Sequence, residues 1–107
     1  MGSELLAGTL DMLILRSLTR TRRHGYGIAQ HLKKISEDVL DVGESSLYPA
    51  LQRLLLNGWV TAEWGASENN RRARYYKLTA AGRKQLAAEN REFGRMIVAI
   101  QKVMSCA

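Results

Sequence analysis

Residues 45–53 carry the side chains in this sequence that are best suited to contact a nucleic acid. Gln52 can pair with an adenine edge through two hydrogen bonds, and Arg53 can pair with guanine in the same way. Hydroxyl groups can bind phosphate oxygens, as can the free N–H groups at a helix N-terminus. Helical spacing directs one set of side chains away from the apolar face of this segment. This set consists of Ser45, Ser46, Pro49, Gln52, Arg53 and Leu56, with Tyr48 at the boundary.

A second group of cations follows at Arg71, Arg72 and Arg74. Residues 69–88 hold six cations and no acid, and so do residues 12–36, while the whole chain has a net charge of +6. One such cluster is commonly only a solvated face, but two separated blocks favour a shaped basic surface for a polyanion. Four acids occupy residues 37–44, and Glu44 there suits the positive end of a helix dipole.

No pattern in the sequence predicts catalysis or metal binding. His24 and His31 lack cysteine or carboxylate partners at metal-ligand spacing. No serine has a histidine and an acid in a readable triad, and the glycine motifs that bind nucleotides are missing. Cys106, the single cysteine, cannot form an internal disulfide. We therefore expect no enzyme, no metal site and no cofactor.

The first 35 residues predict two short helices. The first runs from about Leu10 to Thr21. A second apolar stripe on this helix indicates burial on both sides or contact with a partner chain. That stripe consists of Leu5, Met12 and Leu15. The turn at residues 24–27 begins the second helix, and Tyr26 in this turn is a further candidate for DNA contact.

A third helix is predicted from about Ser45 to Asn57. Its inner face consists of Leu47, Leu51, Leu54 and Leu55. Gly58 is well placed to end it, because glycine adopts the left-handed conformation without penalty. Because proline lacks an N–H group, Pro49 is expected in the first turn, with the N-cap at Ser45 or Ser46.

Two alternating stretches, residues 59–64 and 73–78, predict a β-hairpin with a long basic tip. Thr79 can cap a last helix from about Ala80 to Met104. The predicted fold is mainly α with a small β-hairpin, arranged as a winged helix-turn-helix. In that fold one helix enters the DNA major groove and the hairpin, or wing, follows the backbone. We assign residues 5–78 to the winged region and 79–107 to a C-terminal dimerisation helix, within a single domain of 1–107.

The sequence resembles the PadR family of bacterial transcriptional regulators over about residues 5 to 85. The segments that carry the resemblance are residues 24–28 (HGYGI), 46–54 (SLYPALQRL), 58–60 (GWV) and 72–82 (RARYYKLTAAG). The resemblance implies a homodimeric, repressor-type regulator of the compact branch, which has a single C-terminal dimerisation helix. One position departs from the family, which usually carries Glu where this chain has Leu55.

The last predicted helix has a heptad-like seam. Its two sets of positions are Asn90, Ile97 and Met104, and Leu86, Phe93 and Ile100. Either this helix covers its own core, or it packs on the second stripe of the first helix and on a second copy. We expect the second arrangement, in a C2 dimer. Asn90 either fixes the register of the seam or is simply exposed.

Related regulators bind small apolar compounds between such helices. Met96 and Met104 suit an adaptable pocket but fit a plain core better, so a small apolar effector stays open. Without a membrane-spanning run or a signal peptide, the chain is interpreted as cytoplasmic, with no membrane partner. The predicted function is sequence-specific binding of double-stranded DNA by a homodimeric transcriptional repressor at a pseudo-palindromic operator. The alternatives are a winged-helix protein-interaction module and a nonspecific nucleic-acid binder.

Overall fold

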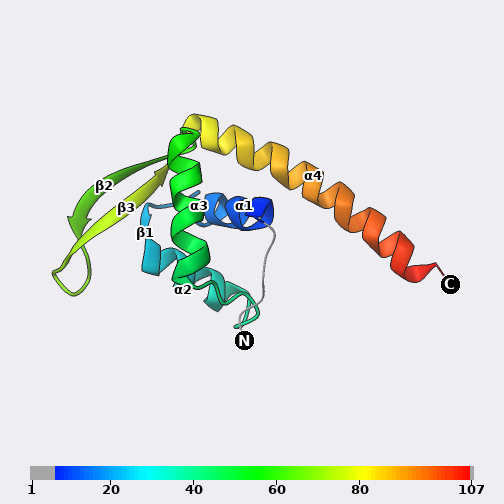
Figure 1. Ribbon diagram of the computed structural model, residues 1–107, viewed down its shortest axis with the longest axis horizontal. Helices are drawn as coiled ribbons and strands as arrows, with labels where there is room; N and C mark the ends of the chain where they lie inside the picture. Colours follow the sequence, from blue (N-terminus) through cyan, green and yellow to red (C-terminus); the bar gives the residue numbers. More distant parts are fainter. Residues whose placement is uncertain (1–6, 107) are drawn as a thin grey trace.

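The computed structural model describes residues 7–106, which form four helices and a small antiparallel sheet. In chain order the elements are α1 (Ala7–Ser17), β1 (Arg23–His24), α2 (Gly25–Ile35), α3 (Glu44–Leu56), β2 (Val60–Ala66), β3 (Arg72–Leu78) and α4 (Ala80–Ser105). The predicted winged helix-turn-helix with a long last helix is confirmed. The β2–β3 hairpin, which is the wing, and α4 leave the body formed by α1, α2 and α3 on opposite sides (Figure 1).

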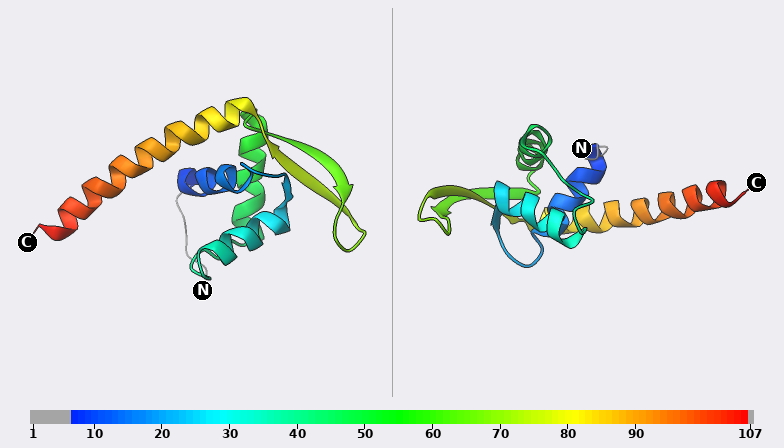
Figure 2. Two further views of the ribbon diagram at one scale, coloured as in Figure 1. Left: turned by 180° about the vertical axis from the view of Figure 1, so that it is seen from behind. Right: turned by 90° about the horizontal axis from the view of Figure 1, so that it is seen from below.

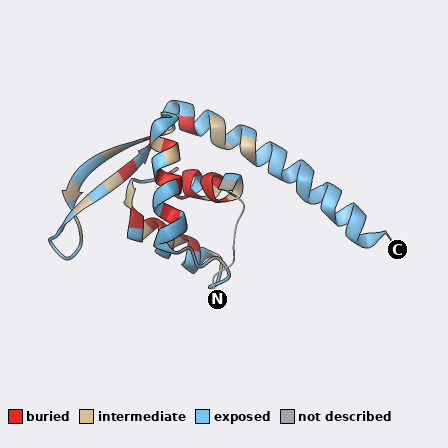
Figure 3. Ribbon diagram, viewed as in Figure 1, coloured by how far each residue is buried: buried red, intermediate tan, exposed pale blue. Residues whose placement is uncertain are grey.

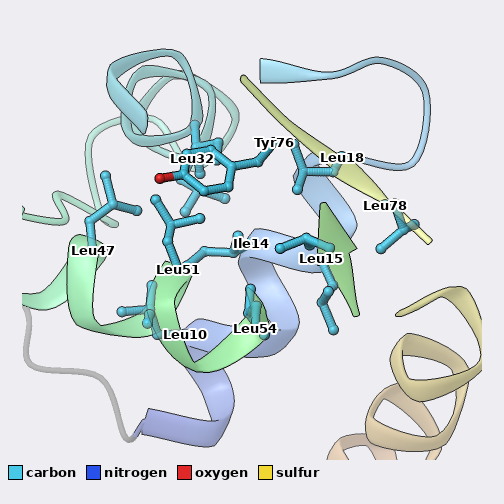
Figure 4. Close-up of a cluster of buried hydrophobic side chains, with 13 residues drawn as sticks. Leu10, Ile14, Leu15, Leu18, Leu32, Leu47, Leu51, Leu54, Tyr76 and Leu78 are labelled. Carbon is cyan, nitrogen blue, oxygen red and sulfur yellow. The ribbon is translucent and has the colours of Figure 1, made fainter. Parts of the chain in front are cut away.

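The core lies where α1, α2 and α3 meet the inner end of the wing (Figure 4). Ile14 and Leu15 of α1 are both 0% exposed, as are Ile28 of α2 and Leu54 of α3. Val60, at the inner end of the wing, also belongs to the core and is 2% exposed. The predicted inner face of α3 is largely confirmed, because Leu47, Leu51 and Leu54 are buried while Leu55 is half-buried.

The sheet has three strands in the order β1-β3-β2, one more than the predicted hairpin. β1 pairs with β3 through Arg23 opposite Tyr76 and His24 opposite Tyr75. β2 and β3 pair along their whole length, from Val60 opposite Leu78 outward to the tip. The added strand is only two residues long, so it has no alternating pattern by which the sequence could have revealed it.

The predicted start of α3 is wrong. Its N-cap is Gly43, whose carbonyl accepts hydrogen bonds from the N–H groups of Ser46 (3.1 Å) and Leu47 (3.0 Å). Pro49 therefore lies in the second turn, where its missing N–H leaves the carbonyl of Ser45 without a helical donor. Both Ser45 and Pro49 are exposed, so water can satisfy this carbonyl and the helix tolerates the proline.

The predicted caps on either side of the wing are confirmed. Gly58 follows the end of α3 with φ of 73°, and its N–H donates to the carbonyl of Leu55 (3.1 Å). Thr79 precedes α4, and its hydroxyl accepts a hydrogen bond from the N–H of Gly82 (3.0 Å). These caps fix the directions in which the wing and α4 leave the body.

Helix α4 contacts the body only through its first turns and then extends past it (Figure 2). At Gly82 a Cβ atom would lie 2.0 Å from the carbonyl oxygen of Trp59, so a larger residue does not fit. Arg83 donates through Nη2 to the carbonyl of Thr19 (3.0 Å) near the end of α1. From residue 90 to 105 every residue of α4 is exposed, as the pale blue ribbon in Figure 3 indicates.

Candidate nucleic-acid interface

The outward face of α3 presents most of the side chains that the sequence singled out. The residues of this set that are exposed are Ser45, Ser46, Tyr48, Pro49, Gln52 and Leu56. They lie opposite the buried leucines, because α3 packs its inner face on α1 and on the inner end of the wing. The face therefore offers two hydroxyls, a phenol and an amide on a rigid helix.

The start of α2 is held beside this face. His24 caps α2, since its Nδ1 accepts a hydrogen bond from the N–H of Gly27 (2.9 Å). The ring of Tyr48 lies 3.2 Å from the point that a Cβ on Gly25 would occupy, so α3 and α2 touch here. Tyr26 is 66% exposed, and its hydroxyl accepts from Nε2 of Gln30 (2.7 Å). Tyr26 and Tyr48 thus lie beside the contact between the start of α2 and α3.

Two arginines of the wing lie over aromatic rings. Arg72 and Arg74 lie on one face of β3, and both side chains are exposed. The Arg72 guanidinium carbon lies 4.7 Å from the ring centroid of Trp64, and that of Arg74 lies 5.8 Å from the ring of Tyr76. Arg71, the third predicted cation, is exposed in the turn before β3. Trp64, which the sequence analysis did not select, is 60% exposed and belongs to the same face.

A cavity of about 800 Å³ opens between the wing and α2. Arg72 and Arg74 line it from the wing, and Tyr26 and Tyr48 line it from the helices. It also brings in cations that were not selected as site residues. These are Arg22 before β1, Arg23 in β1 and Lys34 in α2. The signal for them was the acid-free stretch at residues 12–36, which gave their charge but not their place.

This cavity is electropositive, and its charge acts on His31, one of the residues that line it. Partial burial, with the nearby charges of Arg23 and Lys34, lowers the pKa of His31 from its usual 6.5. At the inner end of the cavity, burial raises the pKa of Tyr76, although the Arg74 cation opposes this shift. Such a surface attracts anions.

Arg53 differs from the other predicted contacts, because it is already engaged inside the chain. Its Nη2 lies 2.8 Å from Oδ1 of Asp11, and its Nε lies 3.3 Å from Oδ2. This hydrogen bond raises the pKa of Arg53 above its usual value. The Arg53 side chain is still 41% exposed, whereas that of Asp11 is 12% exposed. Sequence reasoning missed Asp11, which lies 42 residues from its partner.

The predicted dimerisation residues that the structure describes fall into three groups. Met12, Leu86 and Asn90 line a second cavity, of about 590 Å³, between α1 and α4. A larger group lies exposed on the outer part of α4, namely Phe93, Ile97, Ile100 and Met104. Leu15 is fully buried in the core of its own chain and has no surface to offer a partner. Leu5 lies outside the described residues.

Two further features of residues 7–106 bear on chemistry. No three His, Cys, Asp or Glu side chains among them gather as metal ligands would. No helix in the same part of the chain is long and apolar enough to cross a membrane.

Comparison with known proteins agrees with this geometry. The model of a family described as the transcriptional regulator PadR-like family matches residues 14–88. A transcriptional regulator from Clostridium thermocellum is 28% identical, with 94% of this chain and 97% of that chain covered and a TM-score of 0.84. A protein of Streptococcus mutans UA159 is also 28% identical, covering 99% and 95% of the two chains, with a TM-score of 0.83. PadR of Bacillus subtilis in complex with operator DNA is 25% identical, covering 75% of this chain and 46% of that one, with a TM-score of 0.66.

Proposed function

The chain belongs to the PadR-like family of transcriptional regulators, which are not enzymes, and from this premise we propose that it is a homodimeric repressor. It binds a pseudo-palindromic operator in double-stranded DNA. The winged region, residues 5–78, binds the DNA, and residues 79–107 join two copies. The observation that carries the proposal is the cationic cavity between the wing and α2, beside the polar face of α3.

The two parts of this surface have different tasks in the proposal. Gln52, exposed on α3, reads a base edge in the major groove, because its amide can both donate to and accept from adenine. Arg71, Arg72 and Arg74 neutralise phosphates, which adds affinity without sequence information. The hydroxyls of Ser45, Ser46, Tyr26 and Tyr48 set the register on the backbone.

Dimer formation is supported by the apolar side chains that α4 leaves exposed. Phe93, Ile97 and Ile100 lie on one side of α4, in line with the α1–α4 cavity at Leu86. A second copy related by a twofold axis would cover this seam on both chains at once. The same axis would present two α3 helices to half-sites about one helical turn apart.

Selection from randomised duplexes at about 150 mM salt tests the proposal, because a specific site should stay favoured by about 10³ or more over random DNA. We expect an enriched palindromic motif. Binding that disappears as salt rises, without any motif, would indicate the nonspecific binder instead. A folded chain that binds no duplex would indicate the protein-interaction module.

Two variants distinguish hydrogen bonding to base edges from neutralisation of phosphate charge. Gln52→Ala should lower affinity for the enriched duplex and leave affinity for random duplex unchanged. Arg72→Ala should weaken both duplexes similarly and reduce the slope of log affinity against log salt by about one. Equal losses on both duplexes for the two variants would remove Gln52 from the base-reading set.

A further inference from the structure

Asp11 is a carboxylate on a buried face of α1, and Arg53 is its partner. The whole residue is 8% exposed and its neighbours Leu10 and Met12 are buried as well. A carboxylate in such surroundings requires a cation and hydrogen bonds, because burying an unpaired charge is strongly unfavourable. Arg53 supplies both, donating from Nη2 to Oδ1 (2.8 Å) and from Nε to Oδ2 (3.3 Å).

The contact fixes the plane of the guanidinium group. Because Asp11 takes the Nε and Nη2 edge, the donors of Nη1 and one donor of Nη2 stay available. The Arg53 side chain is 41% exposed, and it follows Gln52 on α3. The exposed part of the Arg53 guanidinium group is therefore held in a set orientation, with little freedom to rotate, on the same helix as the candidate base-reading residue.

A comparison within the chain separates this pair from an ordinary surface ion pair. Arg22 and Glu63 on the wing also lie close, with Nη1 and Oε1 2.6 Å apart, but their side chains are 43% and 56% exposed. Exposed pairs add little to stability, and partly buried pairs seldom add more than an apolar pair of equal size. The Asp11–Arg53 pair differs from this in that its carboxylate is only 12% exposed, so a largely buried acceptor holds a donor group of α3.

We propose that Asp11 is a positioning residue for DNA binding, which holds Arg53 so that its free edge meets a pair of acceptor atoms on the DNA. Those acceptors belong either to a guanine edge or to a phosphate, and both accept two hydrogen bonds from a guanidinium group. The proposal rests on the proposed function, since it assigns a second residue to the same DNA-binding surface.

A double-mutant cycle tests the proposal, with dissociation constants measured on the enriched duplex and on random duplex below the unfolding temperature. Asp11→Asn should weaken binding to the enriched duplex about tenfold, because the free guanidinium must be ordered on binding. Arg53→Gln should weaken it at least as much. Adding Asp11→Asn to Arg53→Gln should bring no further loss. Arg53→Lys keeps the charge but offers a single point of contact, so it should behave like Asp11→Asn.

The pattern across the two duplexes identifies the acceptor. A loss confined to the enriched duplex means a guanine edge, and an equal loss on both means a phosphate. Glu92→Gln is the matched control, since it breaks the exposed ion pair between Arg95 and Glu92 on α4, away from α3 and the wing, and should leave both constants unchanged. A tenfold loss from Asp11→Asn that persists in the Arg53→Gln background would overturn the proposal, as would unchanged binding by folded Asp11→Asn. If the unaltered chain binds no duplex, the proposed function itself fails.

Discussion

The body of the molecule and the outer part of α4 carry apolar side chains at similar helical spacing, yet they use them differently. In α1, Leu10, Ile14 and Leu15 are at most 4% exposed. In residues 90–105 of α4, which we call the arm, Ile97 is 36% exposed and Met104 is 78% exposed. The body thus covers its own apolar face, whereas the arm keeps the pattern of a buried helix although nothing within residues 7–106 covers it.

This difference shows which part of the molecule buries its apolar side chains within one chain and which part leaves them exposed. Most of the stability of a protein helix comes from packing an amphipathic face and not from intrinsic propensity. The body has that packing within one chain. The arm lacks it, and a contiguous apolar surface of this kind marks an interaction site. A second copy, contributing an identical arm, is the partner that the proposed dimer supplies.

The junction between body and arm gives the largest expected effect. In Gly82→Ala the new Cβ would lie 2.0 Å from a backbone oxygen of Trp59, so α4 must shift as a unit. We expect a loss of about 3 kcal/mol in the free energy of unfolding, measured by urea denaturation. Gly94→Ala, in the same helix with nothing within 4 Å, should instead gain up to about 1 kcal/mol. Equal changes in the two variants would mean that α4 does not dock on the body at Gly82.

The arm should respond to a charge on only one of its sides. Ile100 is 49% exposed and lies in the seam, whereas Val98 is 50% exposed and lies outside it. Ile100→Glu should raise the dimer dissociation constant at least about 100-fold, because it buries a charge without a partner. Val98→Glu should leave that constant nearly unchanged. Sedimentation of the two variants measures both constants, and equal behaviour would show that the seam is not the contact.

A substitution on the wing should weaken DNA binding without changing the dimer dissociation constant. Trp64→Leu removes the ring on which Arg72 stacks, and we expect binding to all duplexes to weaken about three- to fivefold. Trp64→Phe keeps an aromatic face and should lose less. Fluorescence anisotropy with a labelled duplex measures this, and the dimer constant should not move. Equal losses in the two variants would mean that stacking does not hold Arg72.

The smallest expected effect is on the pH dependence of stability, through a residue of the body. The pKa of His31 is lowered in the folded chain, so the unfolded chain takes up a proton first as the pH falls below about 6.5. The free energy of unfolding should therefore decrease as the pH is lowered from about 7 to about 5.5. It should decrease less in His31→Gln. Thermal unfolding of both proteins across this range provides the measurement. An identical decrease in the two would remove His31 as a cause.

Much of the fold follows from local patterns. Helical spacing predicted the buried face of α3, and strand alternation predicted the two strands of the wing. Gly58 and Thr79 marked boundaries because their local conformations need no distant partner. The start of α3 was misplaced because proline was assumed to require the first turn. An exposed carbonyl at Ser45 relaxes that requirement.

The rest of the site depends on contacts between distant parts of the chain. Nothing in the local sequence tells that Asp11 meets Arg53 or that Trp64 carries Arg72. The spacing of Leu15 fits either a partner surface or a core, and only the packing of α1 in the body decides for the core. The cations of the cavity were visible as charge, but their grouping required the fold of the β1–α2 segment against the wing.

The central claim is that two chains, joined by their arms, place two bodies on one operator. The mass of the complex with the enriched duplex, determined by native mass spectrometry at about 150 mM salt or its volatile equivalent, tests this claim most directly. We expect two chains per duplex, and only one body bound to a duplex that keeps a single half-site. One chain bound with full affinity, or a mass that grows steadily as protein coats the DNA, would contradict it.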